Sequence, residues 1–175
     1  YGLPIVLTNC SNNYGPYHFP EKLVPTVILN AIEGKRIPIY GNGSNIRDWL
    51  YVEDHADALL LVLQKGSIGR SYNIGGENEL TNLELVQSLC EILDRAKPRS
   101  KGSYSDLIIF VEDRPGHDVR YSIDPSRIRQ ELDWRPSITV KEGLEKTVRW
   151  YLENEAWWRP LLSRAGVGKR LGKKL

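Results

Sequence analysis

The sequence is poor in the residues that hold metal ions or form disulfide frameworks. It has two cysteines, Cys10 and Cys90, which lie far apart without a CxxC motif, and three histidines with no pair at metal-ligand spacing. Neither a disulfide framework nor a metal site is therefore predicted. Because disulfides mark oxidising compartments, we expect a reducing, cytoplasmic setting.

Long apolar runs and a strong charge of one sign are also missing. The longest purely aliphatic run, residues 58–63, is far shorter than the roughly 20 residues that cross a bilayer. The amino terminus has no basic region followed by an apolar stretch, so no signal peptide is predicted. The net charge of +2 predicts no nucleic-acid binding, and we expect no membrane partner. Since position 1 is not Met, we expect the chain to begin inside a larger protein.

The motifs of a complete redox site are absent as well. No G-x-G-x-x-G or G-x-x-G-x-x-G follows a predicted strand, so no dinucleotide pyrophosphate cradle is predicted. No Walker loop is present, and no Tyr is followed by Lys four residues later. These residues alone therefore do not supply a dinucleotide-dependent catalytic centre.

Apolar segments of strand and helix period alternate along the chain, which predicts an α/β fold. Two capping boxes, Thr81 with Glu84 and Thr139 with Glu142, mark helix starts. The helix at 53–64 is nearly all aliphatic after its first turn, so we expect it to be buried on most sides. The predicted strands are 4–9, 37–40, 47–52, 71–74 and 107–111, and the predicted helices are 22–33, 53–64, 81–96 and 139–154, with a short one opening at 124–125.

A loop dense in amides follows the first predicted strand. It carries Asn9, Asn12 and Asn13 and leads into the helix at 22–33. In open α/β sheets ligands bind beyond the carboxyl ends of strands, and Asn both donates and accepts without charge. The three amides either recognise a polar ligand or only satisfy the backbone of their own loop.

Three further places could bind a ligand. The loop DRPGHD (113–118) contains Arg114, suited to a forked contact with phosphate, and His117, suited to a phosphate oxygen or a hydroxyl. The alternative is a turn with an internal network of Asp113, Arg114 and His117. Arg47 stands at a strand entrance and is either a ligand contact or a solvated surface residue. Asn73 lies in an apolar strand, where it makes either a ligand contact or a structural hydrogen bond.

Four motifs, in this order, resemble the carboxyl-terminal half of the dTDP-glucose 4,6-dehydratase family. They are TNCSNNYGPYHFPEKLVP, PIYGNGSNIRDWLYVEDHADAL, YNIGG and DRPGHD-x-RY, and the resemblance covers roughly residues 1–152. These lyases belong to the extended short-chain dehydrogenase/reductase (SDR) superfamily. The resemblance implies an amino-terminal Rossmann domain that holds NAD and a carboxyl-terminal domain that holds the nucleotide-sugar. It also implies that the catalytic Tyr/Lys and acid pairs lie upstream of residue 1.

The resemblance implies a division of the chain and a reaction. Residues 1–160 would be the nucleotide-sugar-binding part, including late Rossmann strands near 4–9 and 71–74, and 161–175 a basic, flexible tail. The amino-terminal NAD-binding region would be absent. The full-length enzyme, expected to be a homodimer, would convert dTDP-glucose to dTDP-4-keto-6-deoxyglucose and water by internal hydride transfer. That product would serve rhamnose or another deoxysugar. The isolated chain is predicted to be inactive and, with strand edges uncovered, prone to aggregate unless it folds against a partner.

The resemblance also assigns binding roles residue by residue. Arg47 would bind the diphosphate, and Asn13 the nicotinamide side of NAD. No residue of this chain would be catalytic. The substrate-binding set is Asn12, Lys22, Leu23, Pro25, Pro38, Ile39, Tyr40, Arg47, Asn73, Asp113, Arg114 and His117, in which Pro38, Ile39 and Tyr40 border the base and deoxyribose.

Two alternatives stay open at this point. One is another nucleotide-sugar epimerase or decarboxylase of the same superfamily, which would share the YGP motif but differ at 17–22 and at DRPGHD. The other is a non-catalytic nucleotide-sugar-binding module, which the absence of catalytic motifs favours. An upstream G-x-x-G-x-x-G and Y-x-x-x-K would support the enzyme, whereas a start codon close to Tyr1 would support the module.

Overall fold

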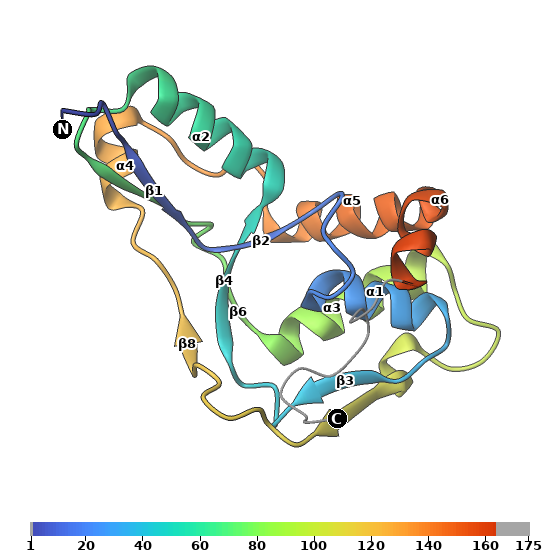
Figure 1. Ribbon diagram of the computed structural model, residues 1–175. Helices are drawn as coiled ribbons and strands as arrows, with labels where there is room; N and C mark the ends of the chain where they lie inside the picture. The colour runs from blue at the N-terminus through green and yellow to red at the C-terminus, as the bar shows by residue number, and fades with distance from the viewer. Residues whose placement is uncertain (1, 164–175) are drawn as a thin grey trace.

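Strands and helices alternate along the chain and form two lobes joined by the strand β4 (Figure 1). The structure is a computed structural model, and it describes residues 2–163. The strands are β1 (Leu7–Cys10), β2 (Asn12–Tyr14), β3 (Ile37–Tyr40), β4 (Ile46–Tyr51), β5 (Ser71–Ile74), β6 (Glu79–Thr81), β7 (Ile108–Val111) and β8 (Arg120–Tyr121). The helices are α1 (Leu23–Ile32), α2 (Val52–Lys65), α3 (Asn82–Ala96), α4 (Ser126–Leu132), α5 (Val140–Glu153) and α6 (Glu155–Trp158), with 3₁₀ turns at Tyr104–Leu107 and Arg159–Ser163. The predicted α/β class is confirmed.

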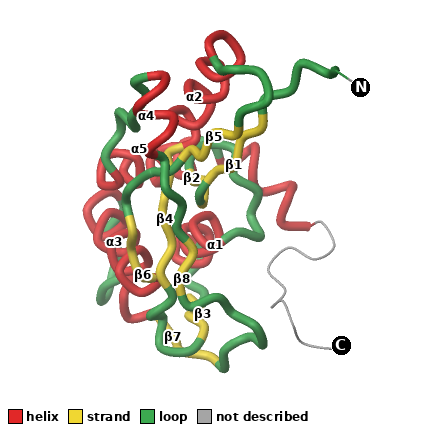
Figure 2. The backbone as a smooth tube through the Cα atoms, turned by 90° about the vertical axis from the view of Figure 1, so that its left-hand side faces the viewer, coloured by secondary structure: helices red, strands yellow, loops and turns green. Residues whose placement is uncertain are grey.

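The strands form three small groups that follow one another along the molecule (Figure 2). β1 pairs with β5 in parallel, and β3 pairs with β7 in parallel. β4 is the hub of the third group, where β2 and β8 run parallel to it and β6 runs antiparallel. Parallel pairs connected through helices are the expected result of βα alternation.

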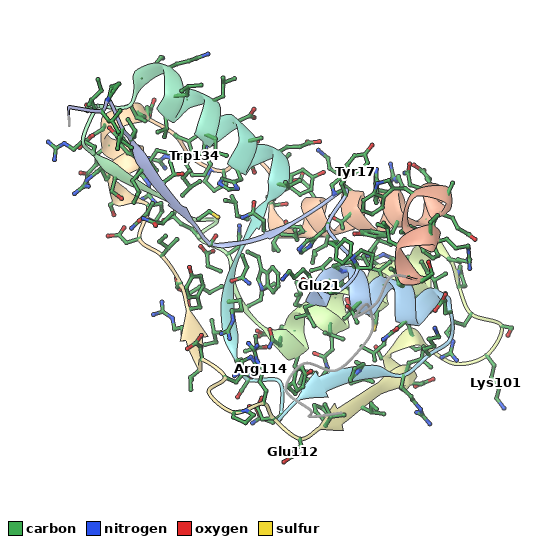
Figure 3. All side chains as sticks on the ribbon, in the orientation of Figure 1. Tyr17, Glu21, Lys101, Glu112, Arg114 and Trp134 are labelled. Carbon is green, nitrogen blue, oxygen red and sulfur yellow. The ribbon has the colours of Figure 1, made fainter. Side chains whose placement is uncertain are left out.

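Each lobe has its own apolar core. The larger core packs α1, α3 and α5 against β3 and β4, around buried side chains such as Ile28, Leu89 and Tyr151. The smaller core joins α2 and α4 to the β1–β5 pair, and Trp134 closes it (Figure 3). β4 serves both cores, because Trp49 belongs to the larger one and Leu50 to the smaller one. This alternation along one strand holds the lobes together.

Helix starts are the best predicted local feature. Both capping boxes are present, with the Thr81 hydroxyl accepting from the Glu84 N–H and the Thr139 hydroxyl accepting from the Glu142 N–H. Each Glu side chain returns a bond to its Thr N–H. α3 and α5 therefore begin where the sequence predicts, since side-chain caps satisfy the free N–H groups of the first turn.

Three expectations from the sequence need correction. β1 begins at Leu7 rather than at position 4. The amide-rich loop contains the strand β2, because Asn12–Tyr14 pair with β4. The helix α2 is not buried on most sides, since Leu60 is 53% and Leu63 is 82% exposed.

Part of the apolar surface of β1 and α2 is not covered by other elements of the described chain. Leu7 on β1 is 55% exposed, and within residues 2–163 β1 pairs with β5 alone. With the exposed leucines of α2, it gives the bare edge and apolar face that were expected. Within the same range, no helix is long and apolar enough to cross a membrane. Of the predicted tail, residues 164–175 lie outside the described residues.

Gly143 in α5 permits a close helix contact that larger residues would prevent. A Cβ at this position would stand 2.9 Å from Tyr14 Cζ, and Tyr14 is itself 1% exposed. We expect Gly143→Ala to destabilise the fold by about 1–2 kcal/mol, because overpacking outweighs the gain in helix propensity. Urea unfolding followed by circular dichroism measures this. Arg149→Ala, a change at an exposed position of the same helix, is the control, and a Gly143→Ala chain at least as stable as the parent would contradict the prediction.

Candidate functional site

A cavity of about 290 Å³ lies between α1, α3, β3, β4 and the loop after β7. Figure 3 shows Glu21 just before α1 and Arg114 near the end of β3, two of the residues that line it. The lining residues are Asn12, Glu21, Leu23, Thr26, Asn30, Pro38, Ile39, Tyr40, Arg47, Trp49, Asn82, Val86, Arg114 and His117. Eight of the twelve predicted substrate-binding residues are in this set, so widely separated motifs meet in one place.

Arg47 is a buried cation without an acidic partner in the cavity wall. Only 8% of the residue is exposed. Its Nη1 donates to the Ile46 carbonyl at 2.6 Å, and its Nη2 donates to the Asp118 carbonyl at 2.9 Å. Among residues 2–163, no ion pair includes Arg47. Burying a charge is costly unless it is compensated, so this arrangement suits an anionic ligand.

Arg114 and His117 add positive or donor groups beside Arg47. Both come from the loop after β7, and His117 Nδ1 lies 2.7 Å from Asp113 Oδ1. The His117 ring meets the Tyr40 ring edge to face, with centroids 6.2 Å apart. The internal network considered for DRPGHD therefore exists, and it coexists with a position at the cavity.

The opposite part of the wall is apolar. Pro38 and Tyr40 are the half-buried residues of β3, whereas Ile37 and Ile39 are almost completely buried in the larger core. Leu23 from α1 and Val86 from α3 also line this cavity. A cavity with apolar walls and a few cationic groups is suited to a ligand that joins a ring to an anion.

The sequence analysis missed several lining residues that share a helical spacing. Thr26 and Asn30 follow Leu23 by three and seven residues, so the three lie on one face of α1. Asn82 and Val86 are four apart on α3 and lie on one face in the same way. Thr26 and Asn30 interrupt the apolar residues of α1, and this interruption could have indicated that their face of the helix lines a site. Glu21 and Trp49 carried no distinguishing signal.

Several predicted site residues lie outside the cavity wall. Lys22 pairs with Glu21, with Nζ 2.9 Å from Oε1, and its side chain is 59% exposed. Pro25 is buried within the first turn of α1. Asn13 Oδ1 lies 2.7 Å from His55 Nδ1, and its Nδ2 donates to the Ser11 carbonyl. Burial lowers the pKa of His55, which favours the neutral ring as partner of this amide.

Asn73 was expected to complete the same pocket, but the structure does not bring it there. It lies on β5, whose partner is β1 in the other lobe. Its Nδ2 donates to the Asp124 carbonyl at 3.1 Å, and its Oδ1 accepts from Asn9. The structural hydrogen bond considered as an alternative is therefore present.

The order of elements and the place of the cavity define a class: the architecture is that of the nucleotide-binding extended SDR proteins. A family model described as GDP-mannose 4,6 dehydratase matches residues 1–147, and the chain belongs to this family. A dTDP-glucose 4,6-dehydratase of Neisseria meningitidis is 55% identical over 175 residues, covering 98% of this chain and 49% of that protein. The dTDP-glucose 4,6-dehydratase 1 of Escherichia coli is 59% identical over 157 residues, covering 90% and 43%.

Solved structures agree with this grouping. DesIV, a dTDP-glucose 4,6-dehydratase from Streptomyces venezuelae solved with NAD and TYD bound, has a TM-score of 0.84 at 45% identity, covering 92% of this chain and 48% of that one. The dTDP-glucose 4,6-dehydratase from Bacillus anthracis in complex with NAD has a TM-score of 0.82 at 49% identity, covering 92% and 49%. The resemblance predicted from four motifs is thus confirmed. The chain spans about half the length of the relatives it matches.

Proposed function

We propose that this chain forms the nucleotide-sugar-binding part of a dTDP-glucose 4,6-dehydratase. The reaction would convert dTDP-glucose to dTDP-4-keto-6-deoxyglucose and water, so the whole enzyme would be a hydro-lyase. Residues 1–160 would be the binding part, with β1 and β5 as late strands of a Rossmann sheet. The isolated chain would bind the nucleotide but would not turn it over, because it contains no Tyr and Lys at catalytic spacing.

The observation that carries the proposal is the buried Arg47 guanidinium at the cavity. Its two backbone acceptors hold it in place without neutralising its charge. A diphosphate supplies the missing negative charge and the acceptor geometry that a guanidinium prefers. Arg114 would bind the same group from the facing loop, and His117 would bind a hydroxyl of the ligand.

The apolar part of the wall suits the base. Pro38, Ile39 and Tyr40 line the cavity, and the half-buried Pro38 and Tyr40 would offer an apolar and aromatic surface to a thymine ring and its methyl group. Asn12 would contact the sugar side of the ligand. Lys22, Pro25 and Asn73 do not line the cavity, and for them a substrate contact requires a ligand that extends beyond the wall.

NAD is the cofactor implied by the relatives solved with it. Asn13 fits a contact to it, because His55 and the Ser11 carbonyl orient the amide while one N–H and one lone pair stay available. When bound, NAD would accept a hydride from the sugar and return it. This chain would contribute only the orientation of that amide.

The proposal has consequences for assembly and setting. The apolar face of β1 and α2 would be covered by the sheet of the NAD-binding part, and the full-length enzyme would be a homodimer. Cys10 and Cys90 are both free, as expected in the cytoplasm.

Calorimetric titration of the folded chain with dTDP tests the proposed binding role directly. We expect dTDP to bind, and UDP and GDP to bind at least tenfold more weakly, because the apolar wall recognises thymine and the deoxyribose. Equal affinity for the three nucleotides would contradict the assignment of the base and favour an epimerase or decarboxylase of the superfamily. Absence of binding would be followed by titration of the chain extended upstream. Binding there would show that the pocket needs the other part, and absence there would overturn the proposal.

A further inference from the structure

The Asp113 carboxylate was assigned a contact with the nucleotide-sugar, but it is turned toward its own loop. Its Oδ1 lies 2.7 Å from His117 Nδ1 and accepts from the Arg114 backbone N–H at 2.8 Å. Asp113 is not among the residues that line the cavity, whereas Arg114 and His117 are. The carboxylate therefore contacts His117 and the backbone of its own loop and does not line the cavity.

The turn after β3 lies against this carboxylate. Gly41, with φ +57°, lies so close that a Cβ there would be 3.2 Å from Asp113 Oδ2. The Gly41 N–H donates to the Val111 carbonyl at 2.9 Å, which ties this turn to the end of β7. Tyr40 packs the edge of the His117 ring, whose side chain is 6% exposed. Asp113 and Tyr40 thus both contact the His117 imidazole, and Gly41 packs against the carboxylate.

We propose that Asp113 is a positioning residue that acts through His117 and does not itself bind the ligand. It accepts from the ring N–H at Nδ1, so that Nε2 carries the lone pair and is the nitrogen left to accept from a ligand hydroxyl in the cavity. The inference has two halves. The ligand half, which is the contact of His117 with a ligand, rests on the proposed function, whereas the ring orientation does not.

Charge balance supports this arrangement over a direct contact. A free carboxylate among the phosphate-binding groups would repel a diphosphate. The hydrogen bond from His117 lowers the pKa of Asp113 below its ordinary value, so the carboxylate stays charged beside the ring. The carboxylate is then directed at the ring and at the Arg114 N–H, while the cavity retains the positive charges of Arg47 and Arg114.

A double-mutant cycle on dTDP binding tests the inference. Asp113→Ala is expected to weaken binding about 5- to 20-fold in the parent chain but less than 2-fold in the His117→Ala chain, because the effect passes through His117. Asp113→Asn, which keeps an acceptor without the charge, should lose less affinity than Asp113→Ala. Glu91→Ala, an exposed loss of the same charge, is the control. An Asp113→Ala effect of the same size in both backgrounds would overturn the inference, since it would show a direct contact or general loop damage.

Nitrogen-15 NMR of the imidazole in the ligand-free chain gives an independent measurement. The parent chain should show His117 with its proton on Nδ1, and Asp113→Ala should shift the ring toward the Nε2–H form. Gly41→Ala should shift it in the same direction, by displacing the carboxylate. Identical ring signals in parent and Asp113→Ala chains would overturn the inference. If the parent and the upstream-extended chain both failed to bind dTDP, the proposed function and the ligand half would fall, and the NMR result would still decide the ring orientation.

Discussion

Arg47→Ala is expected to weaken dTDP binding by about 1.5–3 kcal/mol, the value of a lost hydrogen bond to a charged group. This corresponds to roughly a 10- to 150-fold rise in Kd. The reason is structural, because the guanidinium is already desolvated and anchored on the Ile46 and Asp118 carbonyls before any ligand arrives. Isothermal titration calorimetry at fixed ionic strength measures the change.

Two further variants make the Arg47 result specific. Arg47→Lys keeps the charge but not the fork, so we expect an intermediate loss. Arg70→Ala removes an exposed arginine in the other lobe and should leave Kd within twofold. Thermal unfolding of each variant separates lost contact from lost fold. If a folded Arg47→Ala chain bound dTDP as tightly as the parent, Arg47 would not be a diphosphate contact.

Asp54→Ala is expected to lower the free energy of unfolding by about 3–4 kcal/mol, because it leaves buried donors without an acceptor. Asp54 is 3% exposed and lies in the first turn of α2. Its Oδ1 accepts from the Ser137 N–H at 3.0 Å and the Ser137 hydroxyl at 2.6 Å, and its Oδ2 accepts from the Ile138 N–H at 3.0 Å. This one carboxylate therefore joins α2 to the segment that leads into α5.

The control for Asp54 lies one turn further along the same helix. Asp57 is exposed, and Asp57→Ala should change stability by less than about 0.5 kcal/mol. Urea unfolding followed by tryptophan fluorescence compares the two variants under the same conditions. Similar small effects for both would show that the three bonds of Asp54 are replaced by water in the variant.

The predictable parts of the fold are those that local chemistry determines. Thr81 and Thr139 cap α3 and α5 as expected, and the strand at 71–74 was placed without error. Arg47, Arg114 and His117 could be named because charged or forked donors near turns suggest anion binding. Their meeting in one cavity could not be derived from spacing, and came only from the family resemblance.

The parts that escaped prediction depend on tertiary contacts. β2 forms because β4 offers it a partner, although two of its three residues are Asn, which is depleted in strands. The aliphatic residues of α2 suggested burial, but periodicity does not reveal whether a neighbour covers the outer face. Thr26 and Asn30 gained their place in the cavity from the rotation of α1 against β3.

The separate strand pairs have a consequence for how binding and folding are coupled. β3 pairs with β7 and not with β4. The segment that follows β7 is tied to β4 and to the residue just before it, because the Asp118 carbonyl accepts from both Asn45 and Arg47. A diphosphate held by Arg47 and Arg114 would cross-link these two pieces of sheet. Its free energy would then resist their separation, adding about 2.7 kcal/mol at a hundredfold excess over Kd. A bound diphosphate would thereby stabilise the cavity that holds it.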